Sequence, residues 1–121
     1  MATENKTPEY TPMPFVIRCN DEYVGFLMVG FEDGEDIDAG EEIYWMCKFM
    51  IDNSHQNKGY GKLAMTELIK YLRTNPMGRK VNKIYTAIVL GNIGADKLYT
   101  SVGFEKTGSM FGNEELMCMT F

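Results

Sequence analysis

The sequence predicts one α/β (α+β) domain with a mixed, mostly antiparallel sheet, a central parallel pair of strands and flanking helices. The chain has 121 residues, of which 45% are hydrophobic. That length suits one domain with a core and is too short for two comfortable ones. Apolar runs typical of strands alternate with two segments of helical apolar spacing, in the order β-β-β-α-β-α-β-β. A strand that follows a strand and a helix usually joins the first one in parallel, through a right-handed crossover.

The chain begins with a polar segment, residues 1–14, that carries three prolines. We expect a flexible tail here and the domain over residues 15–121, because so polar a segment cannot bury enough apolar surface to order itself. Residues 15–19 and 23–31 are rich in strand-forming types and are separated by a short polar turn. They should therefore pair as an antiparallel hairpin.

The most informative stretch joins a third strand, residues 42–51, to a helix over residues 58–73. Gly59 and Gly61 open that helix, and apolar residues then recur at helical spacing until Pro76 and Gly78 stop it. The remaining elements are expected in this order: a strand at 83–90, a short helix at 92–102, a strand at 104–110, a turn at 112–113 and a closing strand at 115–121.

A strand-to-helix joint with two glycines is suited to a phosphate or pyrophosphate. The first N–H groups of a helix lack intrahelical partners, the helix dipole adds positive charge there, and glycine lets a ligand approach the main chain. The spacing excludes the P-loop and the dinucleotide fingerprint, since the third glycine and the Lys-Ser/Thr pair are missing. A glycine-tolerant loop that opens an ordinary surface helix is the alternative.

Two motifs carry a family resemblance. Residues 56–61 fit Gln/Arg-x-x-Gly-x-Gly/Ala, and residues 92–104 fit Asn-x-x-Ala-x-x-Leu-Tyr-x-x-x-Gly-Phe at every anchor position. In this order, after a strand and on helices, they resemble the GNAT N-acetyltransferases. Residues 22–30, 45–52 and 111–117 look most similar to the bacterial spermine/spermidine (diamine) acetyltransferases within that family.

The resemblance implies direct transfer of an acetyl group from acetyl-coenzyme A to a primary amine, without a metal. A polyamine such as spermidine or spermine is the expected acceptor, and another amine, on an aminoglycoside, a protein N-terminus or a lysine, is the alternative. The pyrophosphate would meet main-chain N–H groups, the pantetheine arm would run along the end of the third strand, and an asparagine would fix the arm. The pyrophosphate would be bound by Gln56, Asn57, Lys58, Gly59, Tyr60, Gly61 and Lys62. The pantetheine arm would be bound by Phe49, Met50, Ile51 and Asn92, and Tyr99 would lie next to the thioester.

For catalysis, the resemblance makes Tyr99 the general acid that protonates the leaving thiolate, and a main-chain N–H near Met50 the donor to the thioester oxygen. Without the resemblance, Tyr99 would be a core residue and Asn92 a helix N-cap, and Asn92 could be both. The base that deprotonates the amine is not marked by any motif, and Glu42 or another acid of residues 32–42, acting directly or through water, is our candidate. His55, the single histidine, lies in a polar turn, and Cys47 reads as core packing.

Charge and cysteine content limit the kinds of binding partner that we expect. A net charge of −5 makes a nucleic-acid partner unlikely, and the three cysteines have neither disulfide nor metal-ligand spacing. With no signal peptide and no membrane-length apolar run, we expect a cytoplasmic protein that does not bind membranes. Residues 32–42 carry seven acids and no base. This run is either a solvated loop or a negative rim that attracts cationic substrates.

One departure from the family concerns the acceptor site. Family members begin with a strand and two helices that form one wall of the acceptor pocket, whereas only fourteen residues precede the first hairpin here. The chain is then N-terminally truncated, or a partner subunit such as a second copy in a homodimer supplies the wall, or the acceptor site is open. A catalytically weak acetyl-coenzyme A-binding module is therefore a second hypothesis beside the enzyme.

Overall fold

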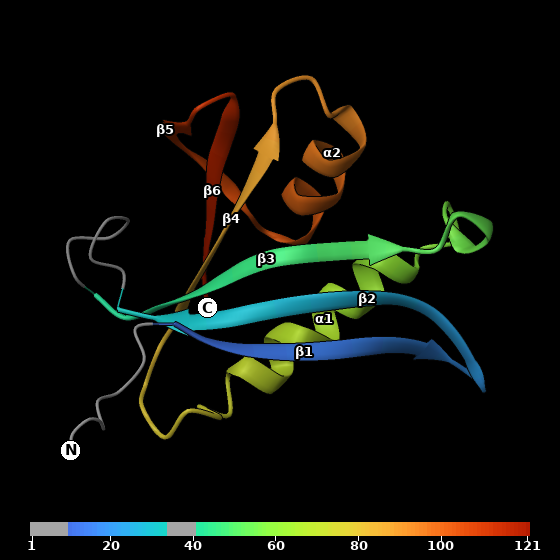
Figure 1. The fold of residues 1–121 in the computed structure, drawn as a ribbon, viewed down its shortest axis with the longest axis horizontal. Coiled ribbons are helices and arrows are strands. Elements are labelled where there is room, and N and C mark those ends of the chain that lie inside the picture. The colour runs from blue at the N-terminus through green and yellow to red at the C-terminus, as the bar shows by residue number, and fades with distance from the viewer. Residues whose placement is uncertain (1–9, 34–40) are drawn as a thin grey trace, which may run out of the picture.

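The computed structural model describes residues 10–33 and 41–121. Within these ranges six strands form one sheet in the order β1-β2-β3-β4-β6-β5, and two α-helices pack on it (Figure 1). The elements are β1 Tyr10–Cys19, β2 Glu22–Glu32, β3 Ile43–Ile51, the short 3-10 turn η1 Asn53–His55, α1 Tyr60–Leu72, β4 Lys83–Val89, α2 Ile93–Val102, β5 Glu105–Phe111 and β6 Glu114–Thr120. The predicted mixed sheet with flanking helices is thus confirmed. Neither described helix is long and apolar enough to cross a membrane.

Strand β1 begins earlier than the sequence predicted. It pairs with β2 from Tyr10 onward, so the expected boundary at residue 15 falls inside a strand. Pro12 and Pro14 had argued against a strand here, because proline has no N–H to donate to the hydrogen bonds between strands. β1 is an edge strand, where a proline is tolerated when its missing donor would have faced away from the sheet. The rest of the expected tail, residues 1–9, lies outside the described residues.

The only parallel pairing in the described sheet joins β3 to β4, and it is short. It consists of Tyr44 opposite Ile84 and Trp45 opposite Tyr85. All other strand pairs are antiparallel. The crossover between β3 and β4 passes through α1, as expected for parallel neighbours.

The two faces of the sheet are covered differently. Successive side chains of a strand point to opposite faces, so Tyr44 and Met46 lie on one face and Ile43 and Trp45 on the other. The first face belongs to the large core cluster, which includes Met65, Leu68, Ile69 and Leu72 of α1 and Tyr99 of α2. The second face has only a small cluster of Ile43, Tyr85 and Leu116, with Trp45 and Cys118 beside it. Both helices therefore cover the same face, and the opposite face has no described helix on it.

Two buried polar side chains in the middle of the sheet differ in their partners. Thr86 is 3% exposed, and its hydroxyl donates a hydrogen bond to the carbonyl oxygen of Met46 at 3.0 Å. This bond joins β4 to β3 one residue beyond their last ladder pair. Tyr44 is fully buried between Phe31 and Phe121, and its hydroxyl has no partner among the described residues. Burial raises the pKa of Tyr44.

These two residues should respond in opposite directions to loss of the hydroxyl. An unpaired buried hydroxyl costs about 1–3 kcal/mol, so Tyr44→Phe should raise the free energy of unfolding or leave it unchanged. Thr86→Val keeps the volume and leaves the Met46 carbonyl unpaired, so it should lower that free energy by about 1–2 kcal/mol. Urea denaturation of the two variants and the parent chain measures both. A Tyr44→Phe variant destabilised as much as Thr86→Val would contradict the assignment.

Candidate active site

A cleft opens where β3 and β4 separate. In Figure 1 the two strands start close together and diverge toward their carboxyl ends, with α2 lying in the angle between them. Beyond Trp45 and Tyr85 no further residues of the two strands are paired. The cleft has a volume of about 350 Å³ and is lined by Trp45, Met46, Cys47, Lys48 and Phe49 of β3, Thr86 and Ala87 of β4, Tyr99 of α2 and Glu114 of β6.

A β-bulge at Cys47 accompanies the separation. Met28 of β2 lies opposite Lys48, and the next residue, Val29, lies opposite Met46, so Cys47 is an extra residue on β3. Its thiol contacts the carbonyl oxygen of Met28 at 3.5 Å. A bulge bends its strand and increases the local twist, and such bulges are common next to active sites. Here it also reverses the alternation of side chains, so that Phe49 turns to the helix-covered face and packs against the core there.

The cleft is bordered by strand edges without a ladder partner. After Trp45, β3 pairs with β2 only, and after Tyr85, β4 pairs with β6 only. Beyond Phe49, its last residue in the cleft lining, β3 continues to Met50 and Ile51; these are the three residues that the sequence assigned to the pantetheine arm. Unpaired main-chain groups on such an edge can receive an extended chain as an added strand.

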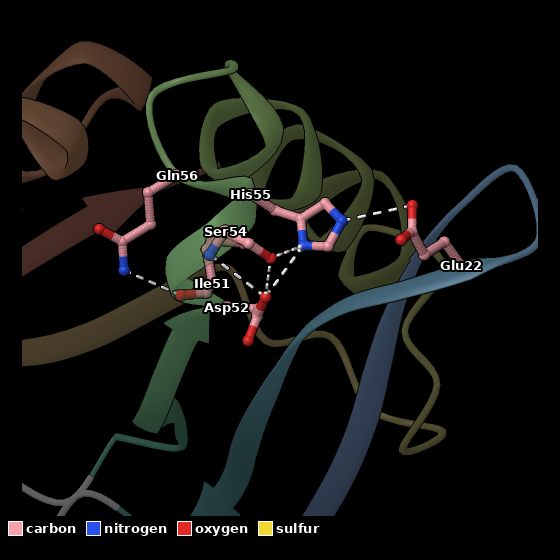
Figure 2. A network of polar contacts seen from close by, with 6 residues as sticks. All are labelled: Glu22, Ile51, Asp52, Ser54, His55 and Gln56. Carbon is pink, nitrogen blue, oxygen red and sulfur yellow. Dashed lines mark hydrogen bonds and ion pairs between the residues drawn. The ribbon is translucent and has the colours of Figure 1, made fainter.

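The turn between β3 and α1 is held by the polar network in Figure 2. The side chain of Asp52 accepts hydrogen bonds from the main-chain N–H of Ser54 at 3.3 Å and from its hydroxyl, and it contacts Nδ1 of His55 at 3.1 Å. The Ser54 hydroxyl, more than any other group, lowers the pKa of Asp52. Nε2 of His55 lies 3.3 Å from Glu22 at the start of β2. The network thus ties the turn to the β1–β2 hairpin, so His55 has a structural place outside the cleft lining.

The start of α1 presents free N–H groups. Gln56 donates from Nε2 to the carbonyl oxygen of Ile51 at 3.0 Å, which fixes the chain just before the helix. Gly59 is the N-cap residue, with φ +82° and no side-chain capping bond, and Leu63 N–H is the first to bond back to its carbonyl. The N–H groups of residues 60–62 therefore precede the first intrahelical bond. Together with the exposed side chains of Lys58 and Lys62, they suit an anion such as a pyrophosphate.

The two glycines of this loop have different functions. Gly59 adopts a left-handed conformation with open space where a Cβ would lie, so its backbone conformation is what requires glycine. Asn57, also left-handed at φ +64°, is of a residue type that tolerates this region. Gly61 is helical, and a Cβ there would lie 3.2 Å from Leu98 of α2 and 3.6 Å from Phe49. Gly61 therefore permits the close approach of α2 and β3 to the start of α1.

Tyr99 lies on α2 and lines the cleft. It is 7% exposed, and its ring packs against Phe49 at 6.2 Å and Phe104 at 5.4 Å between ring centroids. Burial raises the pKa of Tyr99 to about 12. The phenol therefore stays protonated throughout the physiological range. The ring of Tyr99 belongs to the core cluster, and the residue also borders the cleft.

Asn92 and Glu42 lie outside the set of residues that line the cleft. Asn92 is the N-cap of α2, and its side-chain oxygen accepts a hydrogen bond from the N–H of Ala95 at 3.1 Å. Glu42 immediately precedes β3 and forms an ion pair with Arg79. At about 3.3 Å per strand residue, roughly 20 Å or more of β3 separates Glu42 from Phe49. The structure does not bring Glu42 to Tyr99, because the cleft opens at the other end of the strand.

The sequence analysis overlooked Glu114, the one carboxylate that lines the cleft. Glu114 is opposite Val89 of β4 and Phe111 of β5 in the sheet. It reaches the cleft only because β6 lies between β4 and β5, an arrangement that no local motif encodes. A group of three or more His, Cys, Asp or Glu side chains able to hold a metal ion is not found in the described ranges.

Comparison with known proteins identifies the class. Residues 3–104 match the model of the acetyltransferase (GNAT) family. The chain therefore belongs to this family, as the two sequence motifs indicated.

Two curated relatives come from Bacillus subtilis, a spermine/spermidine N(1)-acetyltransferase of strain 168 and a probable spermine N(1)-acetyltransferase of subspecies natto. Each is 36% identical over 95 residues, which cover 78% of this chain and 60% of the relative. The chain thus spans less than two thirds of the length of these relatives.

Solved structures share the fold. An aminoglycoside acetyltransferase in complex with coenzyme A and kanamycin has a TM-score of 0.73 at 21% identity, covering 91% of this chain and 67% of the other. The paia N-acetyltransferase from Thermoplasma acidophilum in complex with coenzyme A has a TM-score of 0.74 at 12% identity, covering 92% and 62%. At these identities the likeness concerns the fold alone.

The burial of Tyr99 should make stability sensitive to alkaline pH. An unfolded tyrosine loses its proton near pH 10, whereas the folded one keeps it until about pH 12. The contribution is therefore fully present below pH 10 and is lost as the pH rises toward 12, by roughly 2–3 kcal/mol. Tyr99→Phe removes this dependence, while Tyr44 remains in both proteins. Denaturation midpoints from pH 9 to 12 should fall more steeply for the parent chain, and parallel curves would contradict the burial.

Proposed function

We propose that the protein is an N-acetyltransferase that transfers an acetyl group from acetyl-coenzyme A to a primary amine, with a polyamine such as spermidine or spermine as acceptor. The observation that carries the proposal is the placement of Tyr99 in the cleft between β3 and β4, beside the open edge of β3 that leads to the free N–H groups of α1. Family membership and the polyamine-acetylating relatives support it.

The cofactor half of the proposal rests on main-chain groups. The N–H groups of residues 56–62 would receive the pyrophosphate, with Lys58 and Lys62 adding positive charge. The main chain of Phe49, Met50 and Ile51 would pair with the amide groups of the pantetheine arm. Asn92, which caps α2, would hold the arm from the other side of the cleft. The turn network of Asp52 and His55 keeps the strand and the loop in a fixed relation.

The chemical step needs a donor to the thioester oxygen and a donor to sulfur. A main-chain N–H near Met50, on the unpaired edge of β3, would stabilise the developing oxyanion. The amine nitrogen forms a bond to the acetyl carbon, the carbon–sulfur bond breaks, and its electron pair leaves with sulfur. Tyr99 would donate its proton to that sulfur, the proton released by the nitrogen would pass to water, and Tyr99 would regain a proton from the solvent. Burial makes the phenol a weak acid, so much of its effect would be a hydrogen bond that strengthens as sulfur becomes negative.

Two observations favour a cationic acceptor in the cytoplasm. Residues 32–42 carry seven acids, and the three cysteines have no disulfide spacing in the sequence. Of these acids, residues 35, 36 and 38 lie outside the described ranges, whereas Glu41 and Glu42 are paired with Lys83 and Arg79. A cysteine pattern without a disulfide framework suits a reducing compartment. A second candidate function, an acetyl-coenzyme A-binding module with weak or no catalysis, is favoured by the open face of the sheet that no described helix covers.

Thermal unfolding and turnover together separate the two functions. Acetyl-coenzyme A should raise the unfolding midpoint in both cases. Only the enzyme should release thiol when spermidine, spermine, an aminoglycoside or a lysine peptide is added. A raised midpoint without thiol release on any of these amines would favour the binding module.

Replacing Gly59 by valine should abolish coenzyme A binding. A valine at φ +82° is strained by about 1–2 kcal/mol, and the loop would shift its N–H groups away from the ligand. Gly78→Val is a matched control, because Gly78 has φ +77°, equally open surroundings and a position outside the site. Calorimetry should give a Kd for coenzyme A raised at least tenfold for Gly59→Val only. Equal affinities in the two variants would remove the loop from the binding site.

Tyr99→Phe should lower kcat at least tenfold and leave the Kd for coenzyme A nearly unchanged. The variant keeps the ring that packs against Phe49 and Phe104 and loses only the hydroxyl. A general acid contributes roughly 10²–10⁴ in rate, which sets the expected range. Steady-state thiol release at saturating amine measures kcat, and turnover equal to that of the parent chain would exclude the tyrosine from the mechanism.

A further inference from the structure

Glu114, unlike the nearby carboxylates of Glu115 and Asp96, has no ion-pair partner among the described residues. The next residue, Glu115, lies 3.6 Å from the amine of Lys106, which also pairs with Asp96 at 3.1 Å. Glu114 is half-buried and lines the cleft with Tyr99. A carboxylate that lines a cleft without a cation beside it can attract one, because opposite charges a few ångströms apart stabilise each other.

The surroundings of Glu114 are apolar and aromatic. Residues directly opposite each other in an antiparallel pair share a face, so Val89 and Phe111 lie on either side of Glu114 on the face that the helices leave open. Val89 is 47% exposed and Phe111 is 42% exposed. The ring of Phe111 lies 6.0 Å from that of Trp45, which also lines the cleft. A carboxylate beside exposed aromatic rings suits an ammonium group carried on a methylene chain.

The effect of a carboxylate on the reaction depends on which nitrogen of the acceptor it binds. An ion pair stabilises the protonated form of an amine, whereas the nitrogen that attacks the thioester must be unprotonated. A carboxylate that grips the attacking nitrogen would therefore slow the reaction. Gripping a different nitrogen of the same molecule positions the substrate without this penalty.

We propose that Glu114, with Trp45 and Phe111, binds a protonated nitrogen of the acceptor other than the one that is acetylated. This inference rests on the proposed acetyltransferase function and assigns the residues that would select diamines and polyamines over monoamines. Glu114 is then a specificity-determining residue, which acts on substrate binding and leaves the cofactor loop at the start of α1 untouched.

Lys48 is the other charged residue of the cleft lining. It lies opposite Met28 after the bulge, across the cleft from β6, and no ion pair joins it to Glu114. Its positive charge opposes a cationic acceptor. Removing it by Lys48→Gln should therefore lower the KM for a diamine, in the direction opposite to the loss of Glu114.

The test compares spermidine with butylamine, a monoamine that lacks the second charge. Glu114→Gln should raise the KM for spermidine about tenfold or more, since charge-assisted hydrogen bonds are the stronger class. The KM values for butylamine and acetyl-coenzyme A should stay within about twofold. Glu114→Asp should restore part of the affinity for spermidine. Glu115→Gln, the same charge change one residue away on the opposite face, is the control and should leave all three KM values unchanged.

A binding measurement separates this inference from the proposed function. Spermidine is titrated calorimetrically into the parent chain and into Glu114→Gln, each with saturating coenzyme A. A Kd that is at least tenfold weaker for the variant supports the site, even if the parent chain transfers no acetyl group and the proposed function fails. Equal Kd values, no binding of spermidine to the parent chain, or an equal rise in KM for butylamine would each overturn the inference.

Discussion

The parallel contact between β3 and β4 ends after two residue pairs, and the site depends on this early ending. Trp45 opposite Tyr85 is the last ladder pair, and the hydroxyl of Thr86 makes one more link to Met46. Directly beyond, the extra residue Cys47 bends β3 away while β2 continues to hold its other edge. A sheet that stayed paired to the ends of both strands would have no unpaired main chain to offer and no room for Tyr99.

The two faces of the sheet present different groups to the cleft where β3 and β4 separate. Helices α1 and α2 both pack on one face, where Gly61 lets Leu98 approach the start of α1. That face supplies the free N–H groups and the tyrosine, the parts that we assign to the acyl donor. The opposite face carries Trp45, Phe111 and Glu114, which have no described helix above them. In the reaction that we propose, donor and acceptor would approach the cleft from different sides and meet where the strands part.

The features that could be predicted from the sequence are those that depend on residues close together in the chain. The loop from Gln56 to Lys62 and the α2 segment that carries Tyr99 are each readable within a dozen residues, because glycines, caps and helical spacing act between near neighbours. Strand β1 was shortened in the prediction because Pro12 looks like a strand breaker until its edge position is known. Glu42 was selected as a base from its acidic neighbourhood, although it pairs with Arg79 at the far end of β3. Glu114 and the bulge at Cys47 depend on which strands become neighbours, and a single sequence does not give that information.

The contact between His55 and Glu22, in which Nε2 of the imidazole lies 3.3 Å from a carboxylate oxygen, has a consequence for the design of variants. Glu22 begins β2, far along the chain from α1. Its carboxylate nevertheless contacts the imidazole of His55, in the turn that precedes α1 (Figure 2). Changes at the hairpin tip, such as solubility tags or peptide grafts, would therefore act on the loop to which we assign the pyrophosphate. Insertions in the Gly112–Asn113 reverse turn would act on a different part of the molecule, because that turn lies beside Glu114, to which we assign a nitrogen of the acceptor.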